Sequence, residues 1–494
     1  MNFSDIDKPK SNCGIFGIAG NPSASLLTYY SLLAQQHRGQ EASGIVSRYI
    51  SKQSNKVSFF VKKGQGLVSE IFNDEKIFSE ELVGNAAIGH NRYSTSGSNN
   101  LTNVQPFIVK YRDGNLAISH NGNLTNAHII RQQLIKEGAI FQTTSDTEII
   151  LHLISRSKKE KQVDQIIEAL EKVEGAFSLV LLTDDYLYAC RDPFGFRPLS
   201  LGILNNSFVV ASETCAFDLI GAKYIREIER GEILVIKIGE DYSEIIESRL
   251  LSNIPEYPKK CIFEFIYFSR PDSIIFNENV DRVRRQLGKK LAEEHPVSSS
   301  NEKKLAVMSV PDSSNTIAIG YHNQLRTMNI NSKYEIGLIR SHYIGRTFIQ
   351  PEIDKRKLGV KIKFNTVKGV LLNRDVVIVD DSIVRGNTSK QLVNLIREAN
   401  PHKVHIRIAS PPIMYPCFYG MDFPTQEELI ANKFKGNIKE IEKELEVDSL
   451  NYLSFKGMIE CTPEKDEKYY CTACFSGRYP VKIDDSLNKN VNEE

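Results

Sequence analysis

The residue at position 13 is a cysteine whose surroundings allow two interpretations. Gly14 and the apolar run IFGIA follow it, which predicts a buried strand. A cysteine in such a place is most often an inert, apolar side chain. It becomes a nucleophile if residues 1–12 are removed, because its own α-amine can then accept the thiol proton. A free α-amine titrates near ~7.7–8.0 and a free thiol near ~8.5, so this transfer is easy at neutral pH.

A second candidate site lies in the string VVIVDDSIVRGNTS at residues 376–389. The β-branched run predicts a buried strand that ends in Asp380 and Asp381, and a helix opens at Thr388 after a loop that contains Gly386. Free N–H groups at such a loop suit a phosphate, and paired carboxylates at a strand end suit ribose hydroxyls or a divalent cation. A bare Asp-Asp pair is more often a solvated strand end, but the whole string favours the phosphate site.

Cysteine spacing offers a third candidate. Cys471 and Cys474 form a single CxxC pair among eight cysteines. Such a pair alone could be half of a zinc site, a redox pair or neither, and the second close pair of a structural zinc site is absent from the sequence. Eight cysteines in 494 residues are too sparse for a disulfide scaffold.

Composition limits the class of protein. Hydrophobic residues make up 41% and charged residues 25%, which excludes a disordered, fibrous or collagen-like chain. Lys and Arg number 62 against 61 for Asp and Glu, so no basic excess indicates nucleic-acid binding. No apolar run reaches the ~20 residues of a membrane helix, and the N-terminal residues lack a secretory apolar core. We therefore expect a cytoplasmic protein without membrane or nucleic-acid partners.

The elements that position these residues differ between the two halves of the chain. Up to about residue 248, short β-rich segments alternate with turns and with helical stretches at 26–36 and 164–173, which predicts an α/β domain with largely antiparallel sheets. Residues 251–260 contain two prolines and form the best linker candidate. Beyond residue 280, buried strands alternate with helical patterns, which predicts a parallel sheet with crossover helices. The polar stretch from residue 484 is expected to fray.

Further motifs narrow the family. The string at 376–389 is the phosphoribosyl-pyrophosphate (PRPP) motif of type I phosphoribosyltransferases. The other matching stretches are CGIFG (13–17), QHRGQEASGI (36–45), GHNRYSTSG (89–97), HNGNLTN (120–126), RDPFGFRPL (191–199), FIYFSRPDS (265–273), VPDSS (310–314), YIGRTFIQP (343–351) and PPIMYPCFYGMD (411–422). In this order they make the chain resemble the amidophosphoribosyltransferase family along nearly its full length.

The resemblance implies a fold and a division of the chain. The implied fold is α/β: an α+β sandwich of the N-terminal-nucleophile hydrolase type, followed by a parallel-sheet type I phosphoribosyltransferase domain. We expect a propeptide at 1–12, a glutamine amidotransferase domain at 13–248, a phosphoribosyltransferase domain at 249–480 and a flexible tail at 481–494.

The resemblance also implies roles in the glutamine site. Cys13 would be the catalytic nucleophile, and Arg92 would bind the α-carboxylate of glutamine by a two-pronged ion pair. Asp146 would bind the α-ammonium group. The side chain of Asn121 and the N–H of Gly122 would form the oxyanion hole. Without the motif context, Arg92 and Asp146 could equally be a structural ion pair.

In the PRPP site the implied ligands surround a magnesium ion. Asp380 and Asp381 would bind the ribose hydroxyls and Mg²⁺, and Ser313 would complete the metal site. The 5′-phosphate would bind to Arg385, Gly386, Asn387, Thr388 and Ser389. Magnesium is chemically sensible because the leaving pyrophosphate is highly charged. Residues 340–351 match a loop that closes over PRPP in the family, although Ser341-His342-Tyr343 replaces its usual Asn-Arg-Tyr.

Some family members carry a [4Fe-4S] cluster, and this sequence has its four ligands. They would be Cys261, Cys417, Cys471 and Cys474, drawn from dispersed segments as such a cluster allows. The other three cysteines, Cys190, Cys215 and Cys461, match no ligand position. Members without the cluster begin directly at the nucleophilic cysteine, so the leader and the ligands agree with each other.

The favoured function is glutamine-dependent synthesis of 5-phosphoribosylamine from PRPP, with release of glutamate and pyrophosphate. By resemblance this is the first committed step of purine synthesis, with AMP- and GMP-type feedback inhibitors and a homotetramer. A non-enzymatic PRPP or purine sensor on the same fold is the alternative, but it predicts a damaged nucleophile or a basic DNA-binding element. A glucosamine-phosphate or asparagine synthase would need a different second half.

Overall fold

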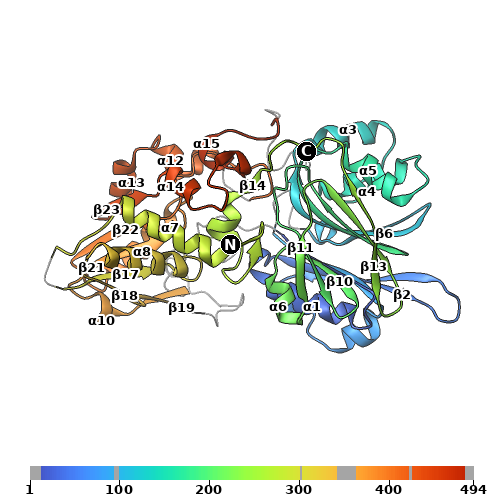
Figure 1. Cartoon of the computed structure of the whole chain (residues 1–494), viewed down its shortest axis with the longest axis horizontal. Coiled ribbons are helices and arrows are strands. Elements are labelled where there is room, and N and C mark those ends of the chain that lie inside the picture. Colours follow the sequence, from blue (N-terminus) through green and yellow to red (C-terminus); the bar gives the residue numbers. More distant parts are fainter. Residues whose placement is uncertain (1–12, 94–99, 301–302, 342–362, 422–424, 484–494) are drawn as a thin grey trace, which may run out of the picture.

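The computed structural model describes residues 13–93, 100–300, 303–341, 363–421 and 425–483. The expected propeptide at 1–12, nearly all of the expected closing loop and the tail from residue 484 lie outside these ranges. Two parts lie side by side, with strands β1 to β13 in one and the later strands in the other (Figure 1). No helix in the described ranges is long and apolar enough to cross a lipid bilayer.

The first part contains two antiparallel sheets. The seven-stranded sheet has the order β11-β9-β10-β1-β4-β2-β3 and the six-stranded sheet the order β13-β12-β8-β7-β6-β5. The strands of the first are β1 (Gly14–Ala19), β2 (Ala42–Ile50), β3 (Val57–Gln65), β4 (Ala86–Arg92), β9 (Ser200–Leu204), β10 (Ser207–Ala211) and β11 (Lys223–Glu227). Those of the second are β5 (Phe107–Tyr111), β6 (Gly114–Leu124), β7 (Gly175–Thr183), β8 (Tyr186–Arg191), β12 (Glu232–Ile238) and β13 (Ser243–Leu250).

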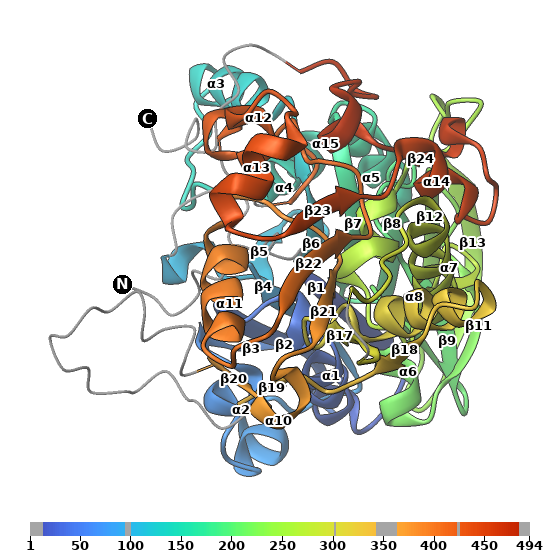
Figure 2. The same ribbon diagram turned by 90° about the vertical axis from the view of Figure 1, so that its left-hand side faces the viewer.

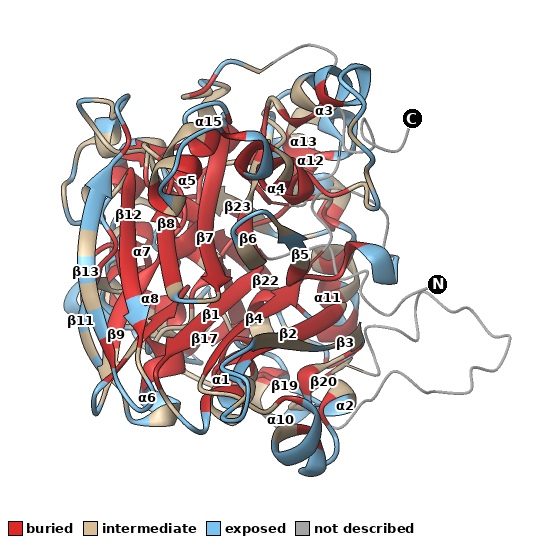
Figure 3. Ribbon diagram, turned by 90° about the vertical axis from the view of Figure 1, so that its right-hand side faces the viewer, coloured by how far each residue is buried: buried red, intermediate tan, exposed pale blue. Residues whose placement is uncertain are grey.

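Alternation along the strands builds the layers of this part. On β1, Ile15 points into the core between the two sheets, whereas Phe16 and Ile18 face the opposite way, toward α1 (Ala24–Ala34) and α6 (Cys215–Ile220). The outer face of the six-stranded sheet is covered by α3 (Ala127–Lys136), α4 (Thr147–Arg156) and α5 (Gln162–Leu170). The central strands are buried along their lengths, while β13 at the sheet edge is largely exposed (Figure 3). This arrangement is the predicted antiparallel sandwich.

The second part is built on a five-stranded sheet of order β18-β17-β21-β22-β23 whose described pairs are all parallel. The strands are β17 (Leu305–Ser309), β18 (Ser332–Tyr334), β21 (Asp375–Asp380), β22 (Lys403–Ile408) and β23 (Ser449–Tyr452). Helices α7 (Val280–Glu294) and α8 (Asn315–Thr327) cover one face, and α11 (Asn387–Arg397) and α13 (Ile438–Leu445) cover the other (Figure 2). The parallel sheet is confirmed.

Short elements join the two parts or lie at the edges. The two-stranded pairs are β14 (Lys260–Cys261) with β24 (Tyr470–Cys471), β15 (Ile274–Ile275) with β16 (Glu278–Asn279), and β19 (Leu338–Arg340) with β20 (Phe364–Thr366). The remaining α-helices of the described ranges are α2 (Val68–Ile71), α10 (Lys368–Leu371), α12 (Ile430–Lys433), α14 (Phe455–Glu460) and α15 (Ala473–Ser476).

Helix boundaries depart from the sequence prediction by two or three residues. The helix expected at 26–36 begins at Ala24, and its last predicted residue belongs instead to a 3₁₀ turn, Gln36–Arg38. The helix expected at 164–173 is α5, which spans Gln162–Leu170. Apolar periodicity predicts the buried face of a helix but not its first and last turns, which depend on local backbone geometry.

Candidate active site

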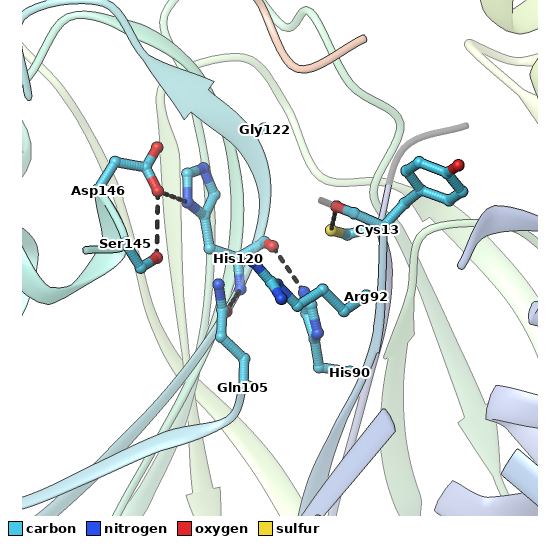
Figure 4. Close-up of a pocket in the computed structure, with 9 residues that line it drawn as sticks. Cys13, His90, Arg92, Gln105, His120, Gly122, Ser145 and Asp146 are labelled. Atoms are coloured by element: carbon cyan, nitrogen blue, oxygen red, sulfur yellow. Dashed lines mark hydrogen bonds and ion pairs between the residues drawn. The ribbon is translucent and has the colours of Figure 1, made fainter. Parts of the chain in front are cut away.

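One pocket of the first part contains most of the residues expected to bind glutamine. Its lining residues are Cys13, His90, Arg92, Tyr93, Gln105, His120, Gly122, Ser145 and Asp146 (Figure 4). They come from both sheets, because β4 supplies one group of them and β6 supplies another, while Cys13 immediately precedes β1. The pocket therefore opens between the sheet that carries the cysteine and the sheet that carries the expected oxyanion hole.

The Cys13 thiol is protonated at neutral pH in the unprocessed chain. Its side chain is buried, and Sγ donates to the backbone oxygen of Tyr93 at 3.6 Å. Burial raises the pKa of the Cys13 thiol, by more than the Tyr93 contact and the Arg92 charge lower it. While residue 12 is attached, the nitrogen of Cys13 is an amide and cannot act as a base. Removal of residues 1–12 would leave a free α-amine that could take the thiol proton.

Asp146 is held in the pocket by neighbouring donors. The Leu124 N–H donates to Oδ2 at 2.9 Å, and the Thr147 hydroxyl donates to Oδ1 at 3.2 Å. Arg92 lies in the same pocket, where burial lowers its pKa and the charges of Cys13, Glu41 and Asp146 oppose that effect. A fixed carboxylate and a guanidinium in one pocket give complementary charges for the two ends of an amino acid.

The expected oxyanion hole has a buried amide without a partner. The Asn121 side chain is completely buried, and within the described chain neither its nitrogen nor its oxygen has a hydrogen-bond partner. Asn121 is not itself a lining residue, but its neighbours His120 and Gly122 are. A Cβ at position 122 would lie 2.0 Å from the Ala176 oxygen, so only glycine fits there. An unpaired buried donor is costly, which is consistent with a group reserved for a ligand.

Two histidines in this pocket were not among the predicted site residues. His90 Nε2 donates to the His120 oxygen at 3.1 Å, a bond that crosses from one sheet of the sandwich to the other. Burial lowers the pKa of His90 to about 3, so the ring is neutral at physiological pH. Strand alternation was the available signal, because His90 lies two residues from Arg92 and His120 two from Gly122, on the same strand faces.

The carboxylates of the second part lie at one edge of the parallel sheet. Strand β21 ends at Asp380, and its neighbour β17 ends just before the turn that carries Ser313. Ser313 Oγ donates to Asp381 Oδ2 at 2.5 Å, and Ser314 Oγ donates to Asp380 Oδ1 at 2.7 Å. Both carboxylates are buried, so the hydroxyls and carboxylates form one oxygen-rich cluster. Oxygen ligands of this kind suit Mg²⁺, which retains waters and shares substrate phosphate oxygens.

The expected phosphate loop opens the helix that follows β21. Gly386 has φ +84° and precedes α11 as its N-cap, so the helix begins at Asn387, one residue before the expected start at Thr388, and ends at Arg397. A Cβ at position 386 would lie 2.4 Å from Ile430 Cδ1, and the positive φ already favours glycine there. The backbone N–H groups of the first helical turn are thus directed toward the same sheet edge as Asp380. Arg385 pairs with Glu428 at 3.4 Å beside the loop.

The four expected cluster ligands converge at the junction of the two parts. Cys261 and Cys471 are register partners in the parallel pair of β14 and β24. Burial raises the pKa of the Cys474 thiol well above its usual value, and Cys417, Cys471 and Cys261 lie close enough to add to that effect. The other cysteines, Cys190, Cys215 and Cys461, are free thiols elsewhere in the fold.

No group of three or more His, Cys, Asp or Glu side chains within the described ranges is arranged to hold a single metal ion. A cluster of four irons and four sulfides is larger than one ion, so its thiolates need not approach as closely. Arg197 lies near Cys261 and Cys417, where its charge would balance that of anionic thiolates. The thiol set is therefore chemically suitable for an iron–sulfur cluster.

Comparison with known proteins agrees with this arrangement. A family described as "Glutamine amidotransferase domain" matches residues 90–218. The chain is 48% identical to amidophosphoribosyltransferase 1, chloroplastic, of Arabidopsis thaliana, over 97% of this chain and 81% of that protein. It is 43% identical to the amidophosphoribosyltransferase of Bacillus subtilis (strain 168), over 99% of both.

Solved structures show the same similarity. Glutamine phosphoribosylpyrophosphate amidotransferase from B. subtilis, complexed with ADP and GMP, has a TM-score of 0.86 and 43% identity and covers 96% of this chain and 99% of its own. A structure described as that of the allosteric regulatory enzyme of purine biosynthesis has a TM-score of 0.87 and 43% identity, with 97% and 99% coverage.

Proposed function

This chain belongs to the amidophosphoribosyltransferase family and is a glutamine-dependent phosphoribosyltransferase of purine biosynthesis, and we propose how its residues divide the reaction. The first part hydrolyses glutamine, and the ammonia attacks C1 of PRPP in the second part. The products are 5-phosphoribosylamine, glutamate and pyrophosphate. The observation that supports this division is the pairing of a Cys13 pocket on one sheet sandwich with a carboxylate cluster on a separate parallel sheet. Pyrophosphate release that requires both glutamine and PRPP tests it.

In the glutamine pocket each group acts on one part of the substrate. Arg92 binds the α-carboxylate and Asp146 the α-ammonium group, which places the side-chain amide beside Cys13. The free α-amine of Cys13 takes the thiol proton, the thiolate attacks the amide carbon, and the same amine returns a proton to the departing ammonia. Water then hydrolyses the thioester that remains, which releases glutamate and restores the thiol. Asn121 and the Gly122 N–H stabilise the oxyanion, each donor being worth about 10²–10³ in rate.

In the second part the same division of roles applies to PRPP. Asp380 and Asp381 bind the ribose hydroxyls, and with Ser313 they would hold Mg²⁺. When bound, the ion neutralises the charge of the leaving pyrophosphate. The loop of residues 385–389 binds the 5′-phosphate through backbone N–H groups and Arg385. Uncharged ammonia is the nucleophile, so it must reach C1 without protonation by bulk water.

Regulation and assembly form part of the same proposal. Purine nucleotides share the ribose-5-phosphate group that the loop at 385–389 binds, and the related B. subtilis structure contains ADP and GMP. We therefore propose AMP- and GMP-type nucleotides as inhibitors. The homotetramer implied by the resemblance and a cytoplasmic location belong to the proposal as well, and the eight free cysteines are consistent with a reducing compartment.

Processing at Cys13 has a direct consequence. We expect a variant whose leader cannot be removed to lack glutaminase activity, because its only nitrogen at Cys13 is an amide and the buried thiol stays protonated. Mass spectrometry of active enzyme is expected to show a chain that begins at Cys13. Ammonium-dependent synthesis by the unprocessed chain serves as the control for folding. An active chain that still carries Met1 would contradict the N-terminal-nucleophile mechanism.

An iron–sulfur cluster would give the enzyme a brown colour and bound iron. Enzyme prepared without oxygen is expected to be brown and to contain about four irons per chain, bound by Cys261, Cys417, Cys471 and Cys474. Cys474→Ser is expected to lose iron and thermal stability, because β14, β24 and α15 would no longer be joined. The matched control is Cys190→Ala, which removes a buried thiol from the first part and is expected to retain iron. Iron-free protein with full activity and stability would contradict the cluster.

A further inference from the structure

Four buried charges meet where the two parts of the chain touch. Arg38, Arg197, Glu213 and Glu264 each have side chains that are 0% exposed. The first three belong to the glutaminase part, whereas Glu264 begins a π-helical turn, Glu264–Phe268, of the part that contains the parallel sheet. The proposed glutamine chemistry does not use any of them directly.

Glu264 forms a two-pronged pair with Arg38. Arg38 Nη1 donates to Glu264 Oε2 at 3.0 Å, and Nη2 donates to Oε1 at 2.9 Å. Ser269 Oγ and Arg197 Nη1 also donate to this carboxylate, at 2.8 Å and 3.2 Å. Although burial opposes ionisation, Arg38 and Arg197 hold the pKa of Glu264 below its usual value. The carboxylate is therefore ionised, and its geometry fixes the plane of the Arg38 guanidinium.

The remaining nitrogen of that guanidinium, Nε, contacts the backbone of Cys13. Arg38 Nε donates to the backbone oxygen of Cys13 at 3.1 Å. The carbonyl carbon of Cys13 is bonded to the Cα that carries both the thiol and the α-amine. Fixing this carbonyl therefore limits how far the thiol and the α-amine can move within the pocket. Glu264 accepts from both terminal nitrogens of Arg38, and Glu213 of the glutaminase part also accepts from Nη1 at 2.5 Å. Glu264 is the partner in the second part that holds Nη2.

We propose that Glu264 is a positioning residue for glutamine hydrolysis, supplied to the glutaminase pocket by the phosphoribosyltransferase part through Arg38. This rests on the proposed role of Cys13 as the nucleophile. Each part supplies a buried carboxylate to the other. Glu213 of the glutaminase part accepts hydrogen bonds from the Arg270 N–H at 2.9 Å and from the Ser273 hydroxyl at 2.7 Å, both in the second part. The alignment of Cys13 then depends on docking of the two parts, so glutamine is hydrolysed efficiently only beside the site that consumes the ammonia.

The test uses the full processed enzyme and compares two reactions in each preparation. Glu264→Gln keeps the size of the side chain but removes its charge and one acceptor for Arg38. We expect kcat for glutamine hydrolysis to fall about 10- to 100-fold, with KM for glutamine within about threefold, because Arg92 and Asp146 are untouched. Ammonium-dependent synthesis is expected to stay within about twofold of the original enzyme, because it does not use Cys13.

Glu227→Gln is the matched control. Glu227 is also a buried carboxylate at this junction, but its partners are Arg191, at 3.1 Å, and the Phe276 N–H of the second part. An equal fall in glutaminase kcat for Glu227→Gln would overturn the proposal, as would equal loss of both reactions in Glu264→Gln. If Glu264→Gln does not fold, Glu264→Asp, which keeps the charge but shortens the reach, is expected to show the same selective loss.

The two proposals fail in different ways. If Cys13→Ala still hydrolyses glutamine, the nucleophile assignment is wrong. If Cys13→Ala is inactive with glutamine while Glu264→Gln retains full glutaminase kcat, the nucleophile stands and the positioning role of Glu264 is wrong.

Discussion

Cys13→Ala is expected to abolish synthesis from glutamine while synthesis from ammonium salts continues. The alanine has no thiol to attack the amide, and loss of a catalytic nucleophile costs at least about 10⁴-fold in such enzymes. The carboxylate cluster that would bind PRPP belongs to the second part, so free ammonia can still attack PRPP there. The measurement is pyrophosphate release with glutamine or with an ammonium salt as the nitrogen source.

A second buried cysteine provides the control for this substitution. Cys190 lies on β8 in the core of the first part and is completely buried. Cys190→Ala removes a thiol of the same kind without touching the pocket, so both reactions are expected to persist. If Cys13→Ala also removed the ammonium-driven reaction, the division into two sites would be wrong.

The fold could be predicted from the sequence because its cores depend on short-range patterns. The apolar run at 376–379 is buried on both faces, with Val377 and Val379 in one core and Val376 and Ile378 in the other. Such a run is typical of a strand in a parallel sheet covered by helices. In the first part the alternation of Ile15 and Phe16 between two cores has the same origin. Each of these patterns can be recognised from a few consecutive residues of the sequence.

The positions of the site residues were predictable only through motifs. Arg92 and Asp146 lie far apart in the sequence, and no periodicity indicates that β4 and the start of α4 face one pocket. The contact between Arg38 and Glu264 joins residues separated by 226 positions, and it depends on how the two parts dock. No local signal distinguishes these two charged residues from solvated ones, since charged side chains are seldom fully buried. Long-range docking, rather than propensity, places them.

Asp381→Asn is expected to lower synthesis from glutamine and synthesis from ammonium salts by a similar large factor, since both need bound PRPP. Asp381 is completely buried, and its carboxylate accepts hydroxyl hydrogens from Ser313 at 2.5 Å and from Ser382 at 2.8 Å. The amide of asparagine turns one of these acceptors into a donor and removes the negative charge that a cation and the ribose hydroxyls would require. We expect pyrophosphate release to fall by about 10²–10³-fold with either nitrogen source.

The same strand supplies a control at its opposite end. Asp375 is also a buried carboxylate of β21, but it accepts the hydroxyl of Ser300 at 2.8 Å, at the edge of the sheet away from Asp381. Asp375→Asn is expected to lower thermal stability while leaving the KM for PRPP unchanged. Ser313→Ala keeps both carboxylates of the cluster. It is expected to lower pyrophosphate release only about tenfold, the scale of one hydrogen bond to a charged group. Unchanged synthesis by Asp381→Asn with either nitrogen source would rule out this sheet edge as the PRPP site.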